Sequence, residues 1–194
     1  PTAAPAANQL DDAKLEEFVS NLRIDGSEDA EIVIVEYSDH QCPFCQRHFA
    51  QGTLQTVVDK FDGEVTKTFK HFPLSFHQQA EPSARAAECV YADAGTEAFN
   101  TFNAEILTKK NLSKDGLLAA AEVAWADVSA VETCFDNGEY ADEVRNQMSE
   151  GQTLFGVRGT PGNVVLNMET GEWKLVSGAQ GPAAFEAAIN ELLQ

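Results

Sequence analysis

Two cysteines separated by two residues, in the stretch Cys42-Pro43-Phe44-Cys45, are the residues of this chain best suited to chemistry. Thiols at this spacing can close a small disulfide ring, so the pair can exchange two electrons with another dithiol. The nucleophile in such an exchange is the thiolate. The free N–H groups and the dipole at a helix N-terminus favour thiolate over thiol. The stretch therefore predicts a redox-active dithiol, provided that a helix begins there.

The residues on either side of the dithiol predict a strand followed by a helix. Ile32–Tyr37 is β-branched and apolar, as a buried strand is. Beyond the cysteines, apolar residues recur at helical spacing, and we expect a helix from Cys42 to about Phe61. Pro43 suits the first helical turn, where a missing N–H costs nothing. Cys42 is thus the expected nucleophile, and Cys45, one turn further on, the expected resolving thiol.

Two other interpretations of the paired cysteines stay open at this point, a zinc site and an inert bridge. A structural zinc site uses four ligands, and a single C-x-x-C supplies two of them. His40 and His48 are close in sequence, but no second C-x-x-C or H-x-x-x-H follows. The strand–helix context favours redox chemistry. We expect no metal, and no cofactor beyond the Cys42–Cys45 disulfide itself.

The composition limits the class of protein. The chain has 194 residues, which suits one domain or one domain with an insertion. Its 31 acidic and 13 basic residues give a formal net charge of −18. This charge argues against nucleic acid, whose phosphates need Lys and Arg, and disfavours docking on anionic membranes. No apolar run approaches the ~18 residues of a transmembrane helix.

The N-terminal residues bear on location. Pro1 to Ala7 are small and Pro-rich, which is typical of a linker. No initiating Met precedes them, and we expect that a signal peptide or a membrane anchor has been removed upstream. A cytosolic protein with a trimmed start is the alternative.

The remaining pattern predicts a sheet interrupted by helices. Ahead of the first strand we expect a helix at Leu10–Leu22. After the dithiol helix the expected elements are a strand at Val65–Phe72, helices at Pro82–Ala94, Thr96–Leu107, Lys114–Trp125, Val128–Phe135 and Tyr140–Leu154, strands at Asn163–Asn167 and Trp173–Val176, and a helix from Pro182. Strands at both ends of the chain with helices between them predict one mixed sheet with a helical insertion.

Three motifs, at Glu36–Cys45, His71–His77 and Gly156–Pro161, resemble those of the DsbA-like thiol–disulfide oxidoreductases of the thioredoxin superfamily, in particular the exported bacterial branch. The resemblance implies an α/β thioredoxin fold with a mixed central sheet and an inserted all-helical domain. We therefore divide the chain into a flexible N-terminal linker at 1–11, a thioredoxin-like core at 12–77 and 155–194, and a helical insertion at 78–154.

The resemblance also implies a function. It predicts an enzyme, a protein thiol–disulfide oxidoreductase that introduces disulfides into exported proteins through a mixed disulfide. Its expected partners are unfolded or reduced exported polypeptides and a membrane redox protein of the quinone-reductase type. We expect a monomer in the periplasm or cell envelope, free or anchored through the missing segment. The alternatives are a reductase or isomerase kept reduced by a membrane donor, or a non-enzymatic peptide-binding or chaperone module with structural disulfides.

The substrate-binding residues follow from the same resemblance. In such proteins the proline of Thr160-Pro161 is cis and packs opposite the active cysteines, where the backbone of Thr160 pairs with an extended substrate peptide. Phe44 is expected near the surface, as part of an apolar rim. We expect the other nearby apolar residues in the core rather than in the rim: Phe72, Leu74 and Phe76.

The residue between the cysteines departs from the best-known oxidants, which carry histidine there. That histidine helps to stabilise the thiolate, and Phe44 cannot donate a hydrogen bond. His40 is a candidate substitute, although a loop histidine is more often solvated. Weaker stabilisation of the Cys42 thiolate would make the disulfide less oxidising.

Glu36 and Lys67 are candidates for proton transfer. Relatives carry a buried acid at the position of Glu36, beneath the active-site disulfide, and Lys67 is expected to face it from the next strand. A buried carboxylate can relay a proton during exchange if burial and a cationic neighbour tune its pKa. The alternative is a solvent-facing Glu36 and a surface Lys67, and the nearby Lys70 makes the register uncertain.

Cys89 and Cys134 both lie on expected helices of the insertion. An even count of four cysteines allows a second bridge in an oxidising compartment, and some relatives carry one. We therefore expect a structural Cys89–Cys134 disulfide. Two buried free thiols are the alternative.

Overall fold

Strand β1 (Ile32–Ser38) lies at the centre of the molecule, and all seven of its residues are buried. The computed structural model describes residues 8–27 and 29–194. The sheet has the strand order β2-β1-β3-β4. The added strands span Val65–His71 (β2), Gly162–Asn167 (β3) and Trp173–Ser177 (β4). β1 is parallel to β2 and antiparallel to β3, which confirms the predicted mixed sheet.

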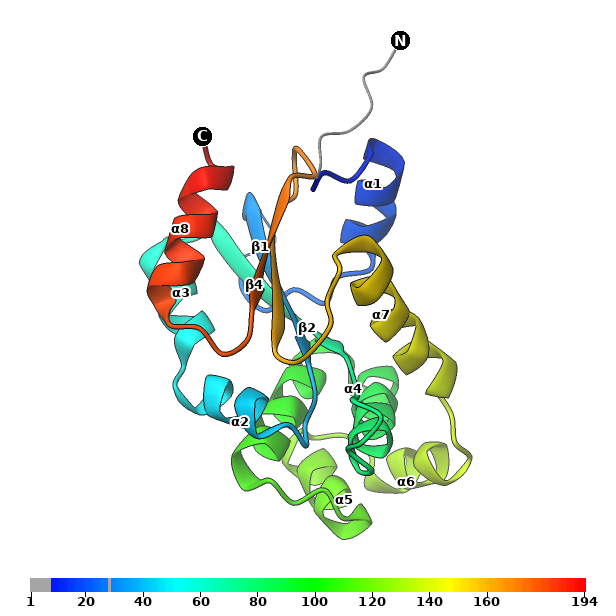
Figure 1. Cartoon of the computed structure of the whole chain (residues 1–194). Coiled ribbons are helices and arrows are strands. Elements are labelled where there is room, and N and C mark those ends of the chain that lie inside the picture. Colours follow the sequence, from blue (N-terminus) through cyan, green and yellow to red (C-terminus); the bar gives the residue numbers. More distant parts are fainter. Residues whose placement is uncertain (1–7, 28) are drawn as a thin grey trace.

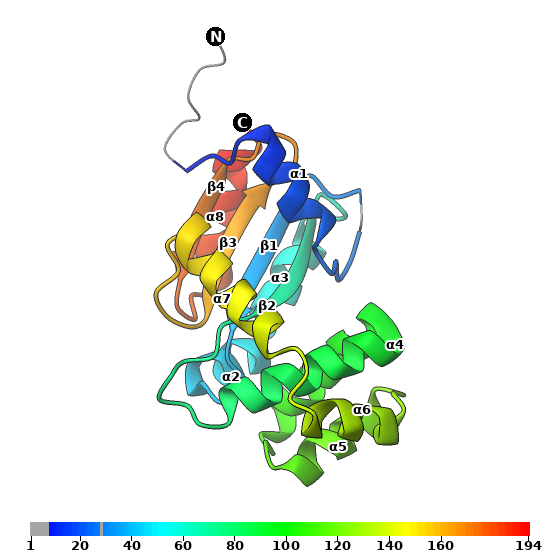
Figure 2. The same ribbon diagram turned by 90° about the vertical axis from the view of Figure 1, so that its right-hand side faces the viewer.

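Helices cover both faces of the sheet, so the core has three layers (Figures 1 and 2). One face packs against α1 and α7 and the other against α3 and α8, which span Asp12–Ser20, Ala141–Leu154, Thr53–Lys60 and Pro182–Leu192. Side chains alternate along a strand, so Val35 and Tyr37 contribute to the first layer and Ile34 to the second. β1 is apolar on both faces because both are covered.

A second helical unit lies at one end of the sheet, drawn in green in Figure 1. It consists of α4 (Ala80–Lys109), α5 (Lys114–Val123) and α6 (Val128–Asp136), which share an apolar core of their own. Gly95 has non-helical angles with φ 80°, and it divides α4 where the sequence predicted two helices. This unit follows β2 in the chain and precedes β3, as expected for an insertion.

Two of the predicted elements differ from the structure. The single helix expected from Cys42 to Phe61 is two helices, α2 (Pro43–Ala50) and α3, because Gly52 between them adopts a left-handed φ of 61°. α7, which we expected in the insertion, packs on the sheet: Gly151 lies against the ring of Tyr37 so closely that a Cβ would clash. Glycine at this position therefore allows the helix to approach the strand.

The N-terminal prediction is only partly covered by the structure. Residues 1–7 of the predicted linker lie outside the described residues. Gln9 forms a β-bridge with Glu172 and Leu10 is buried, so the packed chain begins before residue 12. Among the described residues, no helix combines the length and the apolar character needed to cross a bilayer.

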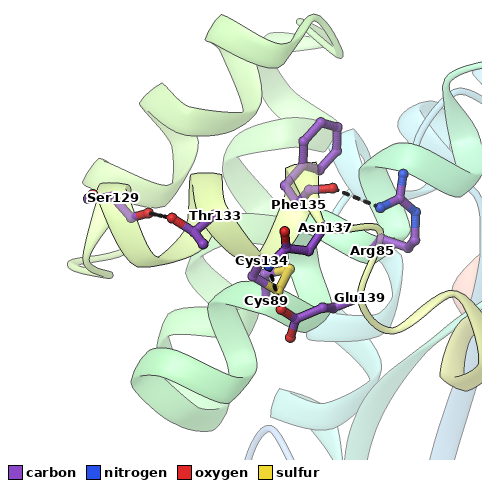
Figure 3. Close-up of a disulfide and its surroundings, with 8 residues drawn as sticks. All are labelled: Arg85, Cys89, Ser129, Thr133, Cys134, Phe135, Asn137 and Glu139. Atoms are coloured by element: carbon purple, nitrogen blue, oxygen red, sulfur yellow. Dashed lines mark hydrogen bonds between the residues drawn. A yellow bond between two sulfur atoms is a disulfide. The ribbon is translucent and has the colours of Figure 1, made fainter.

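A disulfide joins Cys89 on α4 to Cys134 on α6, with Cα atoms 6.0 Å apart (Figure 3). Beside it, Nη1 of Arg85 donates to the carbonyl oxygen of Phe135 at 3.1 Å, which satisfies a carbonyl at the end of α6. The bridge and this hydrogen bond attach the short α6 to the long α4.

We predict that the Cys89→Ala/Cys134→Ala double variant is less stable than the wild type. The bridge spans 45 residues, and closing such a loop stabilises a protein by about 4 kcal/mol in the chain-entropy model. Urea unfolding of both proteins measures the difference in stability. Cys42 and Cys45 are kept reduced in both, under conditions that leave the Cys89–Cys134 bridge of the wild type intact. Equal midpoints and slopes for the two proteins would show that the bridge contributes no stability.

Candidate active site

The predicted dithiol lies at the start of α2. Cys42 is the N-cap residue with extended angles (φ −69°, ψ 121°), and Pro43 occupies the first helical turn. Both cysteines are free thiols. Cys42 is 3% exposed and Cys45 is fully buried. A second molecule can therefore reach only Cys42, and the position at the helix N-terminus is the one that favours its thiolate.

Hydrogen bonds lower the pKa of Cys42 from 9.0 to about 5. The largest contribution is a hydrogen bond from the Cys45 thiol, which outweighs the opposing effect of burial. Hydrogen bonds with Thr160 and with the backbone N–H groups of Cys45 and Phe44 act in the same direction. Donors that stabilise the charged form favour it. At neutral pH Cys42 is therefore a thiolate in the reduced protein.

The pKa of Cys45 is shifted the opposite way. Burial raises it first, and the hydrogen bond to Cys42 and the nearby charge of Glu36 raise it further. Phe69 and Leu107 pack against both cysteines and keep water away. Sequence reasoning missed these two residues, because they come from β2 and α4 and contact the dithiol only in the folded chain. Cys45 stays protonated while Cys42 carries the charge.

The Thr160–Pro161 segment lies against the nucleophile. Its peptide bond is cis, and the Sγ of Cys42 lies 3.6 Å from the carbonyl oxygen of Thr160, to which it donates when Cys42 is in the thiol form. Phe44 is 53% exposed, as expected for a residue at the rim. Phe72 is buried and Leu74 half-buried, but Phe76 is 74% exposed, so the expectation of a core position was wrong for Phe76.

Glu36 is buried behind the dithiol. Its carboxylate accepts a hydrogen bond from the Ser38 hydroxyl at 2.8 Å, and burial raises its pKa from 4.5 to about 7. Ser38 also hydrogen-bonds Cys45. The sequence interpretation missed Ser38, although alternation along the strand places it on the same face as Glu36. A carboxyl group with this pKa can donate or accept a proton near neutral pH.

Lys67 does not contact Glu36, contrary to the expectation. It faces the same side of the sheet, opposite Ile34 in the parallel register, but its ammonium pairs with Asp25. Lys70 points to the other face and pairs with Glu150 at 2.7 Å. Glu36 and Lys67 nevertheless line one cavity of about 320 Å³. Lys67 therefore lies at the edge of the cavity beside Glu36 but does not pair with the Glu36 carboxyl group.

We predict that Glu36 makes the stability of the reduced protein depend on pH. The pKa of the Glu36 carboxyl is about 7 in the folded protein, against an ordinary value of 4.5. The stability that this difference contributes is fully present below pH 4.5 and is lost as the pH rises through about 7. The difference between 4.5 and about 7 corresponds to about 3 kcal/mol. Glu36→Gln keeps an acceptor for Ser38 and removes the charge. The free energy of unfolding of Glu36→Gln, measured in urea, should therefore exceed that of the wild type, and the difference should grow between pH 4.5 and 8.

The comparison between Glu36→Gln and wild type cancels the titration of Cys42, which both proteins share. Glu16→Gln, at an exposed position of α1, is the matched control and should follow the wild type. Parallel curves for Glu36→Gln and wild type would contradict the burial of an ionisable carboxyl at this position.

His40 does not assist the thiolate and is not solvated. It is buried, its Nδ1 lies 3.0 Å from Ser83 and its Nε2 2.8 Å from Asn103, and its ring stacks on Phe69. Burial lowers the pKa of His40 to about 3, so it is neutral. Over the described part of the chain, no group of three or more His, Cys, Asp or Glu side chains is arranged to hold a metal ion.

Comparisons with known proteins agree with this architecture. A thioredoxin family model matches residues 20–191. DsbA2 of Pseudomonas aeruginosa has a crystal structure with a TM-score of 0.72 and 22% identity, over 98% of this chain and 97% of that one. Oxidised BdbD of Bacillus subtilis gives a TM-score of 0.75 and 19% identity, over 89% and 93%. At these identities the two structures show the fold.

Curated relatives match a shorter segment. The Na(+)/H(+) antiporter NhaA 1 of Mycobacterium sp. (strain KMS) is 41% identical over 66 residues, which are 34% of this chain and 10% of the antiporter. The chain therefore spans about a tenth of the length of the curated relatives that it matches. The similarity concerns that segment, and ion transport is not carried over from it.

Proposed function

Since the chain belongs to the thioredoxin family, we propose that it is a thiol–disulfide oxidoreductase and that it acts as an oxidase, which introduces disulfides into exported polypeptides. The observation that carries this direction is the position of Cys42 at the N-terminus of α2, where the Cys45 thiol and the backbone N–H groups of Cys45 and Phe44 lower its pKa to about 5. A stabilised thiolate stabilises the reduced protein relative to its disulfide. The disulfide form therefore gives up its bond readily to a substrate dithiol.

The exchange proceeds in two steps with Cys42 as the point of attack. A substrate thiolate attacks Sγ of Cys42, the Cys42–Cys45 bond breaks, and its electron pair leaves on the sulfur of Cys45. A second substrate thiolate then attacks the substrate sulfur of the mixed disulfide, and Cys42 leaves as the stabilised thiolate. Two electrons pass from the substrate to the protein, and the substrate gains a disulfide.

Glu36 supplies a proton in the first of these steps. Cys45 leaves in a buried position where its thiolate is disfavoured, so it must be protonated as the bond breaks. The carboxyl of Glu36, with a pKa of about 7, is a suitable donor near neutral pH. The cavity beside Glu36, with Lys67 at its edge, offers the route by which the carboxyl regains its proton.

The surroundings of Cys42 suit an extended polypeptide. The cis Thr160–Pro161 segment beside the sulfur offers backbone groups for strand addition. Phe44 presents an exposed apolar ring next to the nucleophile. The substrates of this proposal are accordingly unfolded chains with free cysteines.

The oxidase needs an acceptor for its electrons and an oxidising compartment. We assign the acceptor role to a membrane protein of the quinone-reductase type, which takes two electrons from the Cys42–Cys45 dithiol. The Cys89–Cys134 bridge supports an extracytoplasmic location, since such bridges persist in oxidising environments. The protein acts as a monomer in this proposal.

Oxidation of a reduced, unfolded test protein with two native disulfides tests the function. The oxidised enzyme should convert free thiols into disulfides stoichiometrically, as measured by mass after thiol alkylation. A parallel assay follows reduction of the disulfides of insulin by the reduced enzyme. Faster insulin reduction than thiol oxidation would assign the protein to the reductases instead.

A further inference from the structure

The motif His71–His77 takes no part in the exchange described so far. Its loop leads from β2 into α4 and contains Phe76, whose ring is 74% exposed. An aromatic side chain this exposed in a monomer has no role in the core. The contacts of the loop indicate what it does.

Asp39, three residues before the nucleophile, connects this loop to the dithiol. Its side chain is fully buried. One carboxylate oxygen accepts from the backbone N–H of Gln41 at 2.8 Å. The other accepts from the backbone N–H of Leu74 at 2.9 Å and from Nδ1 of His77 at 2.8 Å. Two of the three donors therefore belong to the loop, and one belongs to the turn before Cys42.

Backbone contacts complete the same connection. The N–H of Phe72 donates to the carbonyl of Ser38 at 2.8 Å, and the N–H of Gln79 donates to the side chain of Gln41 at 2.7 Å. Asp39 itself accepts from the N–H of Cys42 through its carbonyl oxygen at 3.0 Å. One aspartate thus shapes the turn that carries the nucleophile and holds the loop that carries Phe76.

His77 completes the set of three donors that satisfies the buried carboxyl group of Asp39. A buried charge is costly unless it is paired and hydrogen-bonded. Within the described residues, His77 is the side chain that pairs with Asp39, and its own side chain is 16% exposed. The ring of Phe76 packs edge-on against the ring of His77, with centroids 4.6 Å apart. The hydrogen bonds of Asp39 therefore hold the residues on either side of Phe76, Leu74 and His77, to the turn that precedes Cys42.

We propose that Asp39 and His77 are positioning residues that hold Phe76 as a preformed contact for an apolar side chain flanking the reactive cysteine of the substrate. This inference rests on the proposed oxidase function and adds a substrate preference to it. Pre-organisation matters because a loop that must be ordered on binding lowers the affinity. Removing the pair weakens the preference, because Phe76 is then no longer held in one place.

Two reduced dithiol peptides test the proposal, one with leucine and one with serine next to the first cysteine. The measured quantity is the ratio of kcat/KM for the leucine peptide to kcat/KM for the serine peptide. We expect a ratio of about 10 for the wild type, corresponding to one well-packed apolar contact. His77→Leu removes the donor to Asp39 and should lower the ratio to about 1 to 2.

A conservative variant and a matched control separate positioning from a general effect on the fold. His77→Asn keeps a donor near the place of Nδ1 and should restore the ratio to within about twofold of the wild type. Phe76→Ser, at a surface position that does not threaten folding, should lose the preference as His77→Leu does. Trp125→Ser removes an equally exposed aromatic ring, 76% exposed, from the helical unit and should keep the wild-type ratio.

The outcomes distinguish this proposal from the proposed function. A wild-type protein that oxidises neither peptide refutes the oxidase function. An active wild type with an unchanged ratio in Phe76→Ser or in folded His77→Leu refutes the positioning of Phe76. Loss of the preference in Trp125→Ser also refutes it, because the effect would then come from general apolar adhesion.

Discussion

Replacing Cys42 with serine reduces thiol–disulfide exchange to the uncatalysed rate. The variant cannot form the Cys42–Cys45 disulfide, and a serine hydroxyl is not ionised near neutral pH, whereas Cys42 has a pKa of about 5. Cys45 cannot take over the reaction because it is fully buried and its thiolate is disfavoured. Oxidation of a reduced polypeptide, followed by mass after alkylation, is the appropriate assay.

The Cys89→Ala/Cys134→Ala double variant is the control for this experiment. It lacks two cysteines where Cys42→Ser lacks one, but it leaves the dithiol in place, so it should still oxidise substrate below its unfolding temperature. Substantial exchange by Cys42→Ser would mean that Cys45 or the second pair is reactive. That result would contradict the assignment of Cys42 as the point of attack.

Replacing Cys45 with alanine traps the enzyme on its substrate. Cys42 in this variant can still form a mixed disulfide with a substrate that carries a disulfide. Cys45 is then no longer present to displace the substrate, and only the thiol released on the substrate can reverse the step. A covalent adduct should therefore accumulate and be visible on a non-reducing gel. Dithiothreitol should release the substrate from it in the reduced, dithiol form.

The same variant tests the origin of the low pKa. The hydrogen bond from Cys45 is the largest cause of the lowering at Cys42, and alanine removes it. The pKa of Cys42, measured by thiolate absorbance against pH, should move from about 5 toward its ordinary value of 9.0. A pKa that stays near 5 would show that the helix N-terminus and Thr160 are sufficient.

The chemistry of the site could be predicted from the sequence because its signals are local. A β-branched strand, a C-x-x-C and a proline in the first helical turn lie within 14 residues of one another, from Ile32 to Cys45. The burial of Glu36 was expected from the resemblance to DsbA-like proteins, and the structure buries this residue with the rest of β1. Short-range periodicity therefore predicted both the element that carries the nucleophile and the strand beneath it.

The contacts between distant segments could not be predicted in this way. Lys67 pairs with Asp25, which lies in an irregular segment before β1 where no periodicity fixes the position of a side chain. Phe76 looks like a core residue by composition, but its loop is anchored by hydrogen bonds to Asp39 that leave the ring outside. The break at Gly52 depends on a single backbone angle, which a helical pattern of apolar residues does not reveal.

The burial of His40 is another feature that could not be predicted from the sequence. A histidine two residues before a catalytic cysteine suggests a polar role at the surface. The structure buries it between β2 and α4, where Ser83 and Asn103 satisfy its nitrogens. Both partners come from the inserted helices, so the position of His40 depends on how the insertion packs against the core.

The reduction potential of the Cys42–Cys45 pair, measured against a series of glutathione buffers, tests the central claim most directly. A nucleophile pKa of about 7 accompanies about −270 mV in thioredoxin, and one of about 3.5 accompanies about −120 mV in DsbA. A tenfold change in the equilibrium constant, which is one pKa unit of thiolate stabilisation, corresponds to about 30 mV. From the pKa of about 5 for Cys42 we therefore predict a reduction potential of about −165 to −210 mV. A value at or below about −250 mV would contradict the stabilised thiolate and the oxidase function together.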